Sequence, residues 1–293
     1  MAIEAGLALV GLNIGGEWNL PLLANAAALS GASNETALEN DFPPESLQKE
    51  ATYILACETG RRSRNIYEFP APRKRTAVIV GNELTGVPKH VLSAADGIVS
   101  IPMRQARISS INVAAAAAVC LYILEKDLAR KGVRQSDIDQ ADADLLLAGP
   151  DDSSEIGSLL RSAWAFGWQK VYLEDPKGVW FTKDRALILA GRAAARSEKN
   201  PVIVVPAERL DVSRYDAVFV CDGGEGGTPL SRMRLPRVRK LLAVYGPSEI
   251  AQADAARITV DFTNKNVVPR YRLAGSVFLS YLSQCLREPK RHG

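Results

Sequence analysis

Polar residues with the spacing to do chemistry occur at three points in the first half of the chain. The first is Asn19, which opens an apolar segment. The second is the loop 81–86, Gly-Asn-Glu-Leu-Thr-Gly, directly after an apolar run. The third is the segment 101–112, which begins Ile-Pro-Met and ends Ser-Ile-Asn before an alanine-rich stretch. Glycine lets a backbone approach a ligand closely, and apolar side chains can wall a slot for a flat ring. These points predict a small-molecule site.

Histidine and cysteine are too few for most metal or nucleophile chemistry. The histidines are His90 and His292, and the cysteines are Cys57, Cys120, Cys221 and Cys285. No two cysteines form a CxxC pair, so neither a zinc knuckle nor a disulfide framework is expected. With only two histidines, a histidine-centred metal site or a Ser-His-Asp triad is not expected. We therefore expect no metal, and four reduced thiols in a cytoplasmic protein.

Composition and charge exclude several classes of protein. A length of 293 residues suggests two domains or one large one. Hydrophobic residues make up 47% and charged residues 24%, as in globular proteins. The net charge of +3 excludes a polycation and a disordered acidic chain, but it leaves a nucleic-acid partner open. No apolar run reaches the roughly 18 residues that span a bilayer, so no membrane is expected.

Apolar runs alternate with helical patterns along the chain, which predicts an α/β protein with mostly parallel sheets. The expected strands are 6–14, 53–57, 76–80, 97–101, 171–173, 201–205, 216–221 and 241–245. The expected helices are 19–31, 45–51, 112–129, 155–167 and 184–196. An aspartate-rich stretch that contains Gly149 and Pro150 resembles a connector between two packed units.

The second half of the chain repeats the order of the first. The helix 155–167 matches the helix 19–31 in length and in its closing glycine. The strand 241–245 runs into Gly246 as the strand 76–80 runs into Gly81. A third block, the segment 260–282, parallels 101–123 at constant offset. Three shared blocks in one order predict a tandem duplication of one domain.

The loop 81–86 and the segment 101–112 together resemble the G-x-E-x-x-G loop and the IPM…SLNV segment of the SpoU/TrmH family of SPOUT RNA methyltransferases. Ile111 stands where that family has leucine. The resemblance implies two tandem SPOUT-like domains, each with a C-terminal trefoil knot, that form an intramolecular pseudodimer able to exist as a monomer. Their expected bounds are 1–130 for the domain with intact cofactor motifs, 131–150 for an acidic connector and 151–293 for a degenerate domain.

The resemblance also implies a function: methyl transfer from S-adenosylmethionine to RNA, either tRNA or rRNA, and most often to a ribose 2′-hydroxyl. The cofactor-binding residues it implies are Thr59, Gly81, Asn82, Ile101, Met103, Ser110 and Ile111. The catalytic residues are Arg161, Asn19, Glu83, Ser110 and Asn112. Substrate contacts are expected from Arg104 and Arg107, which lie in the third motif.

The family's first motif places an arginine six residues after an asparagine, and each half of this chain keeps one of the two. The first half has Asn19 but carries Asn25 at the arginine position. The second half has Arg161 but carries Glu155 at the asparagine position. We therefore expect Arg161 to serve the cofactor site of the first half. An arginine stays charged near neutrality and can stabilise a developing alkoxide.

Simpler explanations stay open for each of these residues. The loop 81–86 could be a turn, Asn19 and Asn112 could be helix caps, and Arg161 could pair with Glu155. Two basic clusters, at 61–75 and 232–240, are solvated faces by default. Two other functions also remain. A non-catalytic RNA-binding scaffold would not bind S-adenosylmethionine, and a dinucleotide enzyme would bind NAD.

Overall fold

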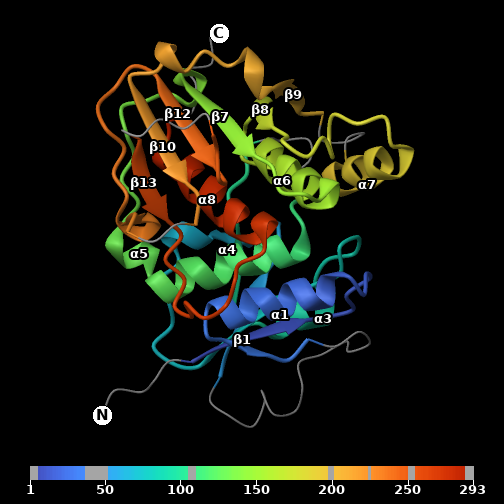
Figure 1. Ribbon diagram of the computed structural model, residues 1–293. Coiled ribbons are helices and arrows are strands. Elements are labelled where there is room, and N and C mark those ends of the chain that lie inside the picture. The colour runs from blue at the N-terminus through green and yellow to red at the C-terminus, as the bar shows by residue number, and fades with distance from the viewer. Residues whose placement is uncertain are drawn as a thin grey trace. The chain divides into compact units, whose positions relative to one another are not determined.

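The computed structural model divides into two compact units, each built around one parallel sheet (Figure 1). It describes residues 6–36, 52–104, 110–196, 201–223, 226–249 and 255–287. Unit 1 consists of Met1–Pro102, Asn112–Gly132 and Phe262–Leu273, and unit 2 consists of Met103–Ile111, Val133–Asp261 and Ala274–Gly293. The expected α/β class with parallel sheets is confirmed.

The sheet of unit 1 has the strand order β2-β1-β5-β3-β6-β4, and every pair is parallel. Its strands are β1 (Leu7–Gly11), β2 (Ser33–Asn34), β3 (Tyr53–Cys57), β4 (Arg64–Asn65), β5 (Thr76–Val80) and β6 (Gly97–Ser100). All five residues of β5 are buried, as continuous apolar runs in parallel sheets predict. Because the strands are parallel, the loops after β3, β5 and β6 start at one edge of this sheet.

The helices of unit 1 contact this sheet or one another. They are α1 (Asn19–Leu29), α3 (Lys89–Ala94), α4 (Val113–Lys126), α5 (Leu128–Lys131) and the 3₁₀ turn η1 (Ile66–Glu68). Alanines fill most of the first two turns of α4, and their small side chains allow α1 and several strands to pack against it. The helix ends at Asp127, which has a left-handed φ of 47°.

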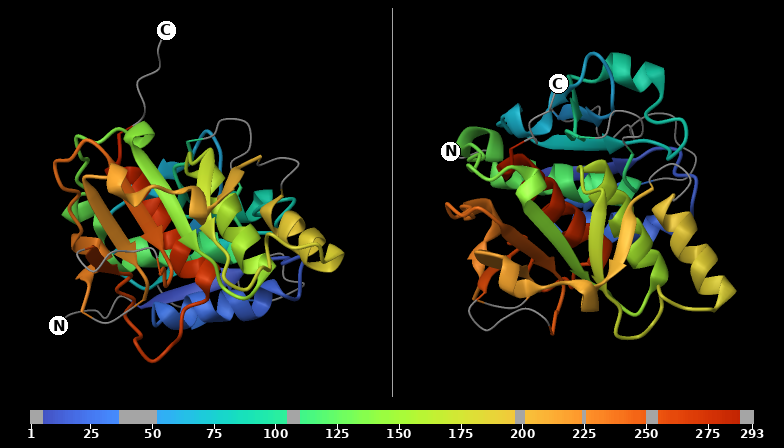
Figure 2. Two further views of the ribbon diagram at one scale, coloured as in Figure 1. Left: turned by 45° about the horizontal axis from the view of Figure 1, so that its top comes forward. Right: turned by 90° about the horizontal axis from the view of Figure 1, so that it is seen from above.

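The sheet of unit 2 has the order β11-β13-β10-β12-β7-β8-β9, again with every pair parallel (Figure 2). Its strands are β7 (Ala143–Ala148), β8 (Lys170–Glu174), β9 (Ile203–Pro206), β10 (Ala217–Cys221), β11 (Thr228–Pro229), β12 (Leu241–Tyr245) and β13 (Ala256–Thr259). Its longer helices are α6 (Ser153–Ala165), α7 (Arg185–Ala195) and α8 (Tyr271–Cys285), the last of which begins in unit 1. Its 3₁₀ turns are η2 (Gln140–Asp142), η3 (Ala207–Arg209), η4 (Val212–Arg214) and η5 (Leu230–Arg232).

Two glycines set the approach of α6 and α7. A Cβ atom at Gly157 would collide with the carbonyl oxygen of Gly191, and a Cβ atom at Gly191 would press on the ring of Trp180. The two helix backbones therefore come together at a point that other residues could not occupy.

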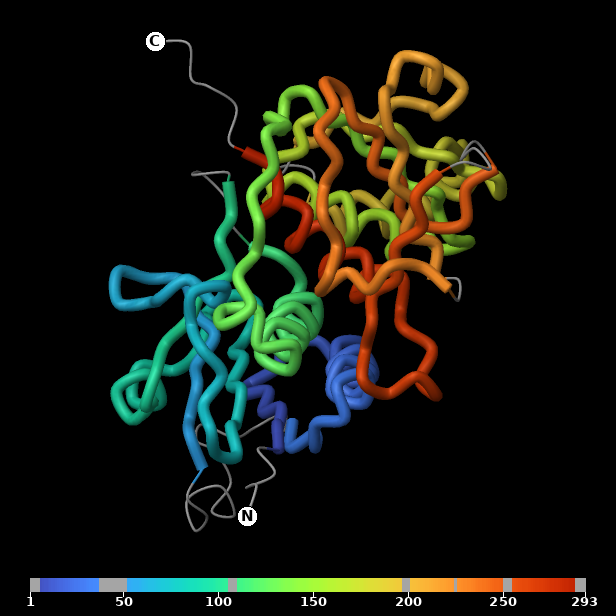
Figure 3. Tube along the Cα trace, turned by 90° about the vertical axis from the view of Figure 1, so that its left-hand side faces the viewer, coloured from blue at the N-terminus to red at the C-terminus, as the bar shows by residue number. Residues whose placement is uncertain are grey.

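The two sheets share one topology. The order β2-β1-β5-β3-β6-β4 in unit 1 matches β8-β7-β12-β10-β13-β11 in unit 2, where β9 is an added edge strand. The unit composition is also reciprocal: the segment 103–111 after β6 belongs to unit 2, and the segment 262–273 after β13 belongs to unit 1. Figure 3 shows this second segment beside α1, where the amide of Asn264 donates to the carbonyl of Leu29 at 3.0 Å. The tandem duplication itself stays a prediction.

Two expectations differ from the structure or fall outside it. The expected connector 131–150 contains β7, a central strand in which Leu145, Leu146 and Leu147 are fully buried. Its aspartates lie at the start of the strand and outside it. The aspartate-rich composition of the stretch therefore drew attention away from the short apolar run that forms the strand. The expected helix 45–51 lies outside the described residues. No helix among the described segments is long and apolar enough to cross a membrane.

Candidate functional site

Asn19 joins two other predicted site residues within unit 1. Its Nδ2 donates to Glu83 Oε1, and its Oδ1 accepts a hydrogen bond of 2.9 Å from Asn112 Nδ2. The other carboxylate oxygen of Glu83 accepts from the amide of Gly15 at 2.9 Å. Asn19 is only 2% exposed, and the helix cap is Trp18, which makes no side-chain cap bond. The explanation of Asn19 as a helix cap is therefore wrong: its amide connects α1 to the loop 81–86 and to the start of α4.

The side chain of Asn82 shapes the loop 81–86 from within. Its Oδ1 accepts hydrogen bonds from the amides of Leu84 and Thr85, at 2.8 and 3.1 Å. Its Nδ2 donates to the carbonyl of Asn13 at 2.6 Å. Asn82 therefore folds its own loop and ties that loop to the chain after β1.

Steric contacts explain the two glycines of the same loop. A Cβ atom at Gly81 would collide with the backbone of Gly86, because Asn82 and Gly86 exchange backbone hydrogen bonds of 3.1 and 2.9 Å. Gly86 has a φ of +72°, and a Cβ atom there would collide with the carboxylate of Glu58. The same carboxylate accepts from the amide of Val87 at 2.8 Å. The glycine spacing is thus a requirement of the loop's closure.

The residues expected to hold the adenine end of a cofactor start from neighbouring strand ends of unit 1. Glu58 Oε1 accepts from the amide and the hydroxyl of Thr59, at 2.8 and 3.3 Å, at the end of β3. Gly81 follows β5, and Ile101, which is 4% exposed, follows β6. Since β5, β3 and β6 are adjacent in the sheet, these residues lie along one edge.

Asn112 both caps a helix and contacts the Asn19 cluster. Its Oδ1 accepts from the amides of Ala114 and Ala115, at 2.9 and 3.3 Å, while its Nδ2 donates to Asn19. The capping explanation of Asn112 is correct, but the side chain also has a second partner. One residue thereby fixes the start of α4 relative to α1.

Arg161 lies on α6 in unit 2 and contacts the residues that directly precede Asn112 in the chain. It is 6% exposed. Its Nε donates to the carbonyl of Ser110 at 2.6 Å, and its Nη2 donates to Ser110 Oγ at 2.8 Å and to the carbonyl of Ile111 at 2.9 Å. Hydrogen bonds from a buried cation are strong. The positive charge of Arg161 is thus held at the segment 110–111.

The structure places Arg104 differently from the expected substrate contact. Its Nη1 donates to the carbonyl of Arg287 at 3.0 Å, and its Nη2 donates to the carbonyls of Ser283 and Leu286. These carbonyls lie at the end of α8, where a cation compensates the helix dipole. Its guanidinium therefore stabilises the end of α8, and the substrate contact expected of Arg104 stays a prediction. Met103 belongs to unit 2 and is partly buried, and Arg107 lies outside the described residues.

Asn25, which stands at the family's arginine position in the first half, has partners that sequence reasoning missed. Its Nδ2 donates to the carbonyl of Val268 at 3.1 Å, and its Oδ1 accepts from the amide of Arg270 at 3.1 Å. By the constant offset of the repeat, these residues correspond to 109 and 111. Asn25 therefore contacts in unit 1 the counterpart of the segment that Arg161 contacts in unit 2. Sequence reasoning also missed Glu58. An acidic residue directly after a buried strand could have indicated a side chain that organises the loops at that edge of the sheet.

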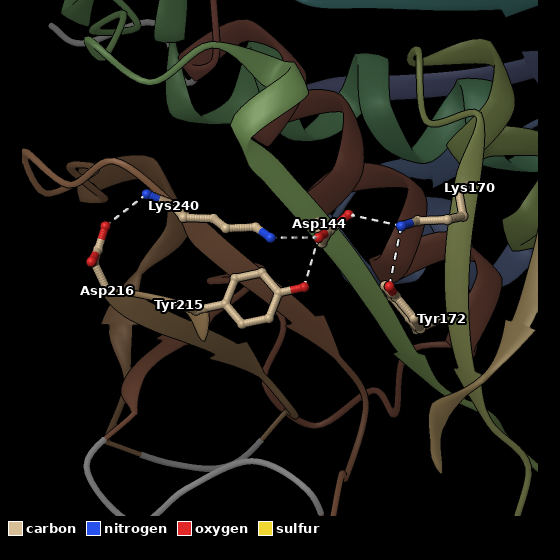
Figure 4. A network of polar contacts seen from close by, with 6 residues as sticks. All are labelled: Asp144, Lys170, Tyr172, Tyr215, Asp216 and Lys240. Carbon is tan, nitrogen blue, oxygen red and sulfur yellow. Dashed lines mark hydrogen bonds and ion pairs between the residues drawn. The ribbon is translucent and has the colours of Figure 1, made fainter. Parts of the chain in front are cut away.

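A second polar cluster lies at the amino-terminal ends of four strands of unit 2, β7, β8, β10 and β12 (Figure 4). Tyr215 Oη donates to Asp144 Oδ2 at 2.6 Å, and Lys170 and Lys240 lie 3.6 and 3.7 Å from the same carboxylate. The ammonium of Lys170 also lies over the ring of Tyr172, and that of Lys240 over the ring of Tyr215. Burial, followed by the hydrogen bond to Asp144, raises the pKa of Tyr215. None of the predicted site residues belongs to this cluster.

In the described part of the chain, no group of three His, Cys, Asp or Glu side chains is arranged to hold a metal ion. The acidic side chains of the candidate site have other partners. Glu83 and Glu58 accept hydrogen bonds from backbone amides and neutral side chains. The described candidate residues of unit 1 therefore lie on loops and helix starts, and in unit 2 the buried Arg161 contacts the segment 110–111.

Comparison with known proteins gives a family match over part of the chain. Residues 30–122 match the model of the SpoU rRNA Methylase family. This segment is SpoU-like. The match confirms the resemblance carried by the loop 81–86 and the segment 101–112, and it leaves Asn19 and Arg161 outside its range. No curated protein matches the chain.

Solved structures show a distant likeness. The SpoU methyltransferase AviRb from Streptomyces viridochromogenes has a TM-score of 0.38 and 17% identity, over 44% of this chain and 62% of that chain. The TrmH/SpoU tRNA modifying enzyme of A. aeolicus has 0.36 and 23%, over 45% and 79%. The AdoMet-bound rRNA methyltransferase from Sinorhizobium meliloti has 0.36 and 18%, over 44% and 57%. The likeness spans less than two thirds of AviRb, and it assigns no residue role here.

Proposed function

We propose that this protein transfers a methyl group from S-adenosylmethionine to a ribose 2′-hydroxyl of tRNA or rRNA. The family match over 30–122 supports an RNA methyltransferase. The observation that carries the finer proposal is the position of Arg161, whose buried guanidinium binds Ser110 and Ile111 directly before Asn112. A positive charge at this segment suits a reaction in which an oxygen becomes negative.

The residues present fit S-adenosylmethionine. Both glycines are required for the loop 81–86 to close on itself, so the chain makes a compact turn directly after β5, where a cofactor would be bound. Thr59, Gly81, Asn82 and Ile101 start from adjacent strand ends, and Met103, Ser110 and Ile111 would complete the binding set. When bound, the cofactor supplies an electrophilic methyl group on its sulfonium.

The catalytic work of the chain would be positioning and charge stabilisation. A ribose hydroxyl has a pKa far above neutrality, so the developing alkoxide needs a cation. Arg161 supplies that cation and keeps it at every accessible pH. Asn19, Glu83 and Asn112 hold the loop 81–86 and the start of α4 in register through their shared hydrogen bonds. Alignment of two reactants accounts for much of such an acceleration.

We propose that the chain is an internal pseudodimer that arose by duplication. The strand order that six strands of each sheet share supports this, as does the correspondence of the Asn25 and Arg161 contacts. In this proposal the half 1–130 holds the cofactor motifs and the half 151–293 is degenerate. The trefoil knot that the family resemblance implies stays a prediction for both halves.

Substitution of Arg161 tests the proposal. Arg161→Ala should abolish methyl transfer from labelled S-adenosylmethionine to RNA while calorimetry still detects cofactor binding. Arg161→Lys keeps a charge but loses the fork geometry, so we expect turnover at least about tenfold below wild type. Circular dichroism and a melting curve check that the variants fold. Wild-type turnover in Arg161→Ala would overturn the proposed role.

The same experiments separate the two competing functions. A wild-type protein that binds RNA but not S-adenosylmethionine would be a scaffold. A protein that binds NAD would be a dinucleotide enzyme. Mass spectrometry of nucleosides from RNA of a strain without the protein would name the target, because one 2′-O-methyl nucleoside should be missing.

A further inference from the structure

Two cysteines of unit 1 lie against each other beside the cofactor loops. Cys57 is the last residue of β3, and Cys120 lies in the middle of α4. Their sulfur atoms are 3.2 Å apart, and the thiol of Cys120 donates to the sulfur of Cys57. Both are free thiols in the structure. Nothing in the proposed methyl transfer uses either of them.

The distance between these sulfurs is short enough for a bond to form with a small movement. A disulfide has a sulfur–sulfur length of about 2.05 Å, so the two atoms need to approach by about 1 Å. A shift of that size can be absorbed by side-chain torsions and a slight strand movement. The two sulfurs are therefore close enough to react with each other, which a single buried thiol cannot do.

The two thiols differ in a way that assigns their roles. Cys57 is partly exposed, whereas Cys120 is fully buried. The hydrogen bond to Cys57, followed by burial, raises the pKa of Cys120, so this residue keeps its proton. A thiolate is the nucleophile in thiol oxidation, and an oxidant reaches the exposed partner first. Cys57 is thus the residue that reacts with the oxidant, and Cys120 is the residue that resolves the product.

We propose that Cys57 and Cys120 form a reversible oxidation site, in which a peroxide converts the pair into a disulfide. The Cys57 sulfur attacks a peroxide oxygen, the O–O bond breaks, and the leaving hydroxide takes the thiol proton to become water. Cys120 then attacks the sulfenic acid sulfur, the S–O bond breaks, and a second water leaves. The two sulfurs together lose two electrons, which the peroxide accepts.

This cross-link would act on the cofactor loops through Glu58. Glu58 follows Cys57 directly, and its carboxylate holds both Thr59 and the amide of Val87 at the end of the loop 81–86. A disulfide would draw the end of β3 toward α4 and displace this carboxylate. We expect the oxidised protein to bind S-adenosylmethionine about tenfold more weakly. This consequence rests on the proposed function, whereas the disulfide itself does not.

The chemical step is tested by peptide mapping of the full chain. The reduced protein is treated with hydrogen peroxide, alkylated under denaturing conditions and digested. We expect a Cys57–Cys120 cross-linked peptide and the loss of two hydrogen atoms from the intact mass, both reversed by dithiothreitol. Cys57→Ser and Cys120→Ala should lack the cross-link, while Cys221→Ser and Cys285→Ser, the matched controls in unit 2, should keep it.

Two outcomes would overturn the site. One is oxidation of Cys57 to sulfinic acid while Cys120 stays fully alkylatable, and the other is retention of both thiols under peroxide. Calorimetry with S-adenosylmethionine then tests the consequence: oxidised wild type should bind more weakly than reduced, and Cys57→Ser should not respond to peroxide. Equal affinities despite a mapped cross-link would overturn the regulation alone. Failure of the reduced wild type to bind cofactor would count against the proposed function alone.

Discussion

The amide of Asn19 connects two segments of unit 1 that are far apart in sequence, the loop 81–86 and the start of α4. Replacing it with alanine leaves the partly buried side chains of Glu83 and Asn112 each without one hydrogen-bond partner. Such losses cost about 1–3 kcal/mol. We therefore expect Asn19→Ala to lower the free energy of unfolding by about that amount, measured by urea denaturation.

The control for Asn19 is Asn34, an exposed asparagine of β2 in the same unit. Surface changes usually stay within about 0.5 kcal/mol, so Asn34→Ala should leave stability almost unchanged. A loss of equal size in both variants would mean that the contacts of Asn19 with Glu83 and Asn112 contribute nothing specific. Comparing the two variants thus separates the loss of a side chain that connects two segments from the loss of an exposed surface side chain.

Tyr215 predicts a pH dependence of stability in unit 2. Its pKa is raised above the usual value of about 10, chiefly by burial and next by Asp144. Above that pH the unfolded chain loses the phenolic proton while the folded chain keeps it, so the unfolded state is favoured as pH rises. We expect the free energy of unfolding to fall above about pH 10, and Tyr215→Phe to flatten this fall. Urea denaturation between about pH 8 and 11 measures both slopes.

A second variant separates the two causes of this shift. Asp144→Asn removes the negative charge but leaves Tyr215 partly buried. Because burial is the larger cause, this variant should reduce the alkaline fall less than Tyr215→Phe does. Parallel curves for wild type and Tyr215→Phe would contradict the assignment.

At the scale of elements, the turn from β5 into the loop 81–86 depends on glycine at two positions. In Gly81→Ala the new Cβ meets the backbone of Gly86, and in Gly86→Ala it meets Glu58 at a residue with φ of +72°. Left-handed backbone alone costs about 1–2 kcal/mol for other residues. We expect both variants to be destabilised by at least that much and to bind S-adenosylmethionine at least about tenfold more weakly.

Gly60 offers a matched control in the neighbouring loop after β3. A Cβ atom there has no heavy atom within 4 Å, so Gly60→Ala should keep both stability and cofactor affinity. Calorimetry and denaturant unfolding on the three variants give the comparison. If Gly60→Ala weakened binding as much as Gly81→Ala, close packing would not explain the glycine pattern.

Apolar runs predicted most of the longer strands, because a strand buried on both faces needs an uninterrupted apolar sequence. The runs 53–57, 76–80 and 241–245 match β3, β5 and β12 at both ends. β7 was missed because its buried leucines lie beside aspartates. Strands of two residues, such as β2 and β4, have no sequence pattern of their own. They form only because a neighbouring strand offers partners for their backbone.

The sequence predicted the candidate site where a local motif determines how a residue is placed. It failed where a contact with a distant part of the chain determines the position of a side chain. The glycine loop and the Asn112 cap follow from local sequence. Arg104 was assigned to substrate because it lies in the third motif, yet its guanidinium binds carbonyls near residue 285 of the same unit. A contact between residues so far apart in the sequence cannot be predicted from the sequence pattern around either of them.

For the whole molecule, the proposed duplication predicts how the chain behaves in solution. A pseudodimer already contains both halves, so we expect a monomer of 31.7 kDa by light scattering. The glycine loop occurs in unit 1, whereas unit 2 has Pro247 at the position of Asn82. Calorimetry should therefore give one S-adenosylmethionine for each chain.

Two results would contradict this picture of the molecule. A scattering mass of twice the chain would show that a second copy is needed. Two cofactors for each chain would show that the half 151–293 binds as well. Because the two measurements are independent, the scattering mass tests whether the chain is a monomer. The number of bound cofactors tests whether the half 151–293 has lost its cofactor site.

The reciprocal segments have a consequence for the synthesis of the protein. Unit 1 includes 262–273. The side chain of Asn25 in α1 bonds the backbone of Val268 and Arg270, and the carbonyl of Leu29 accepts from the amide of Asn264. A nascent chain therefore cannot complete its first unit when residue 132 leaves the ribosome. It must wait until residue 273 has emerged. A gene cut between the two halves would encode two products, each without a segment that belongs to its unit.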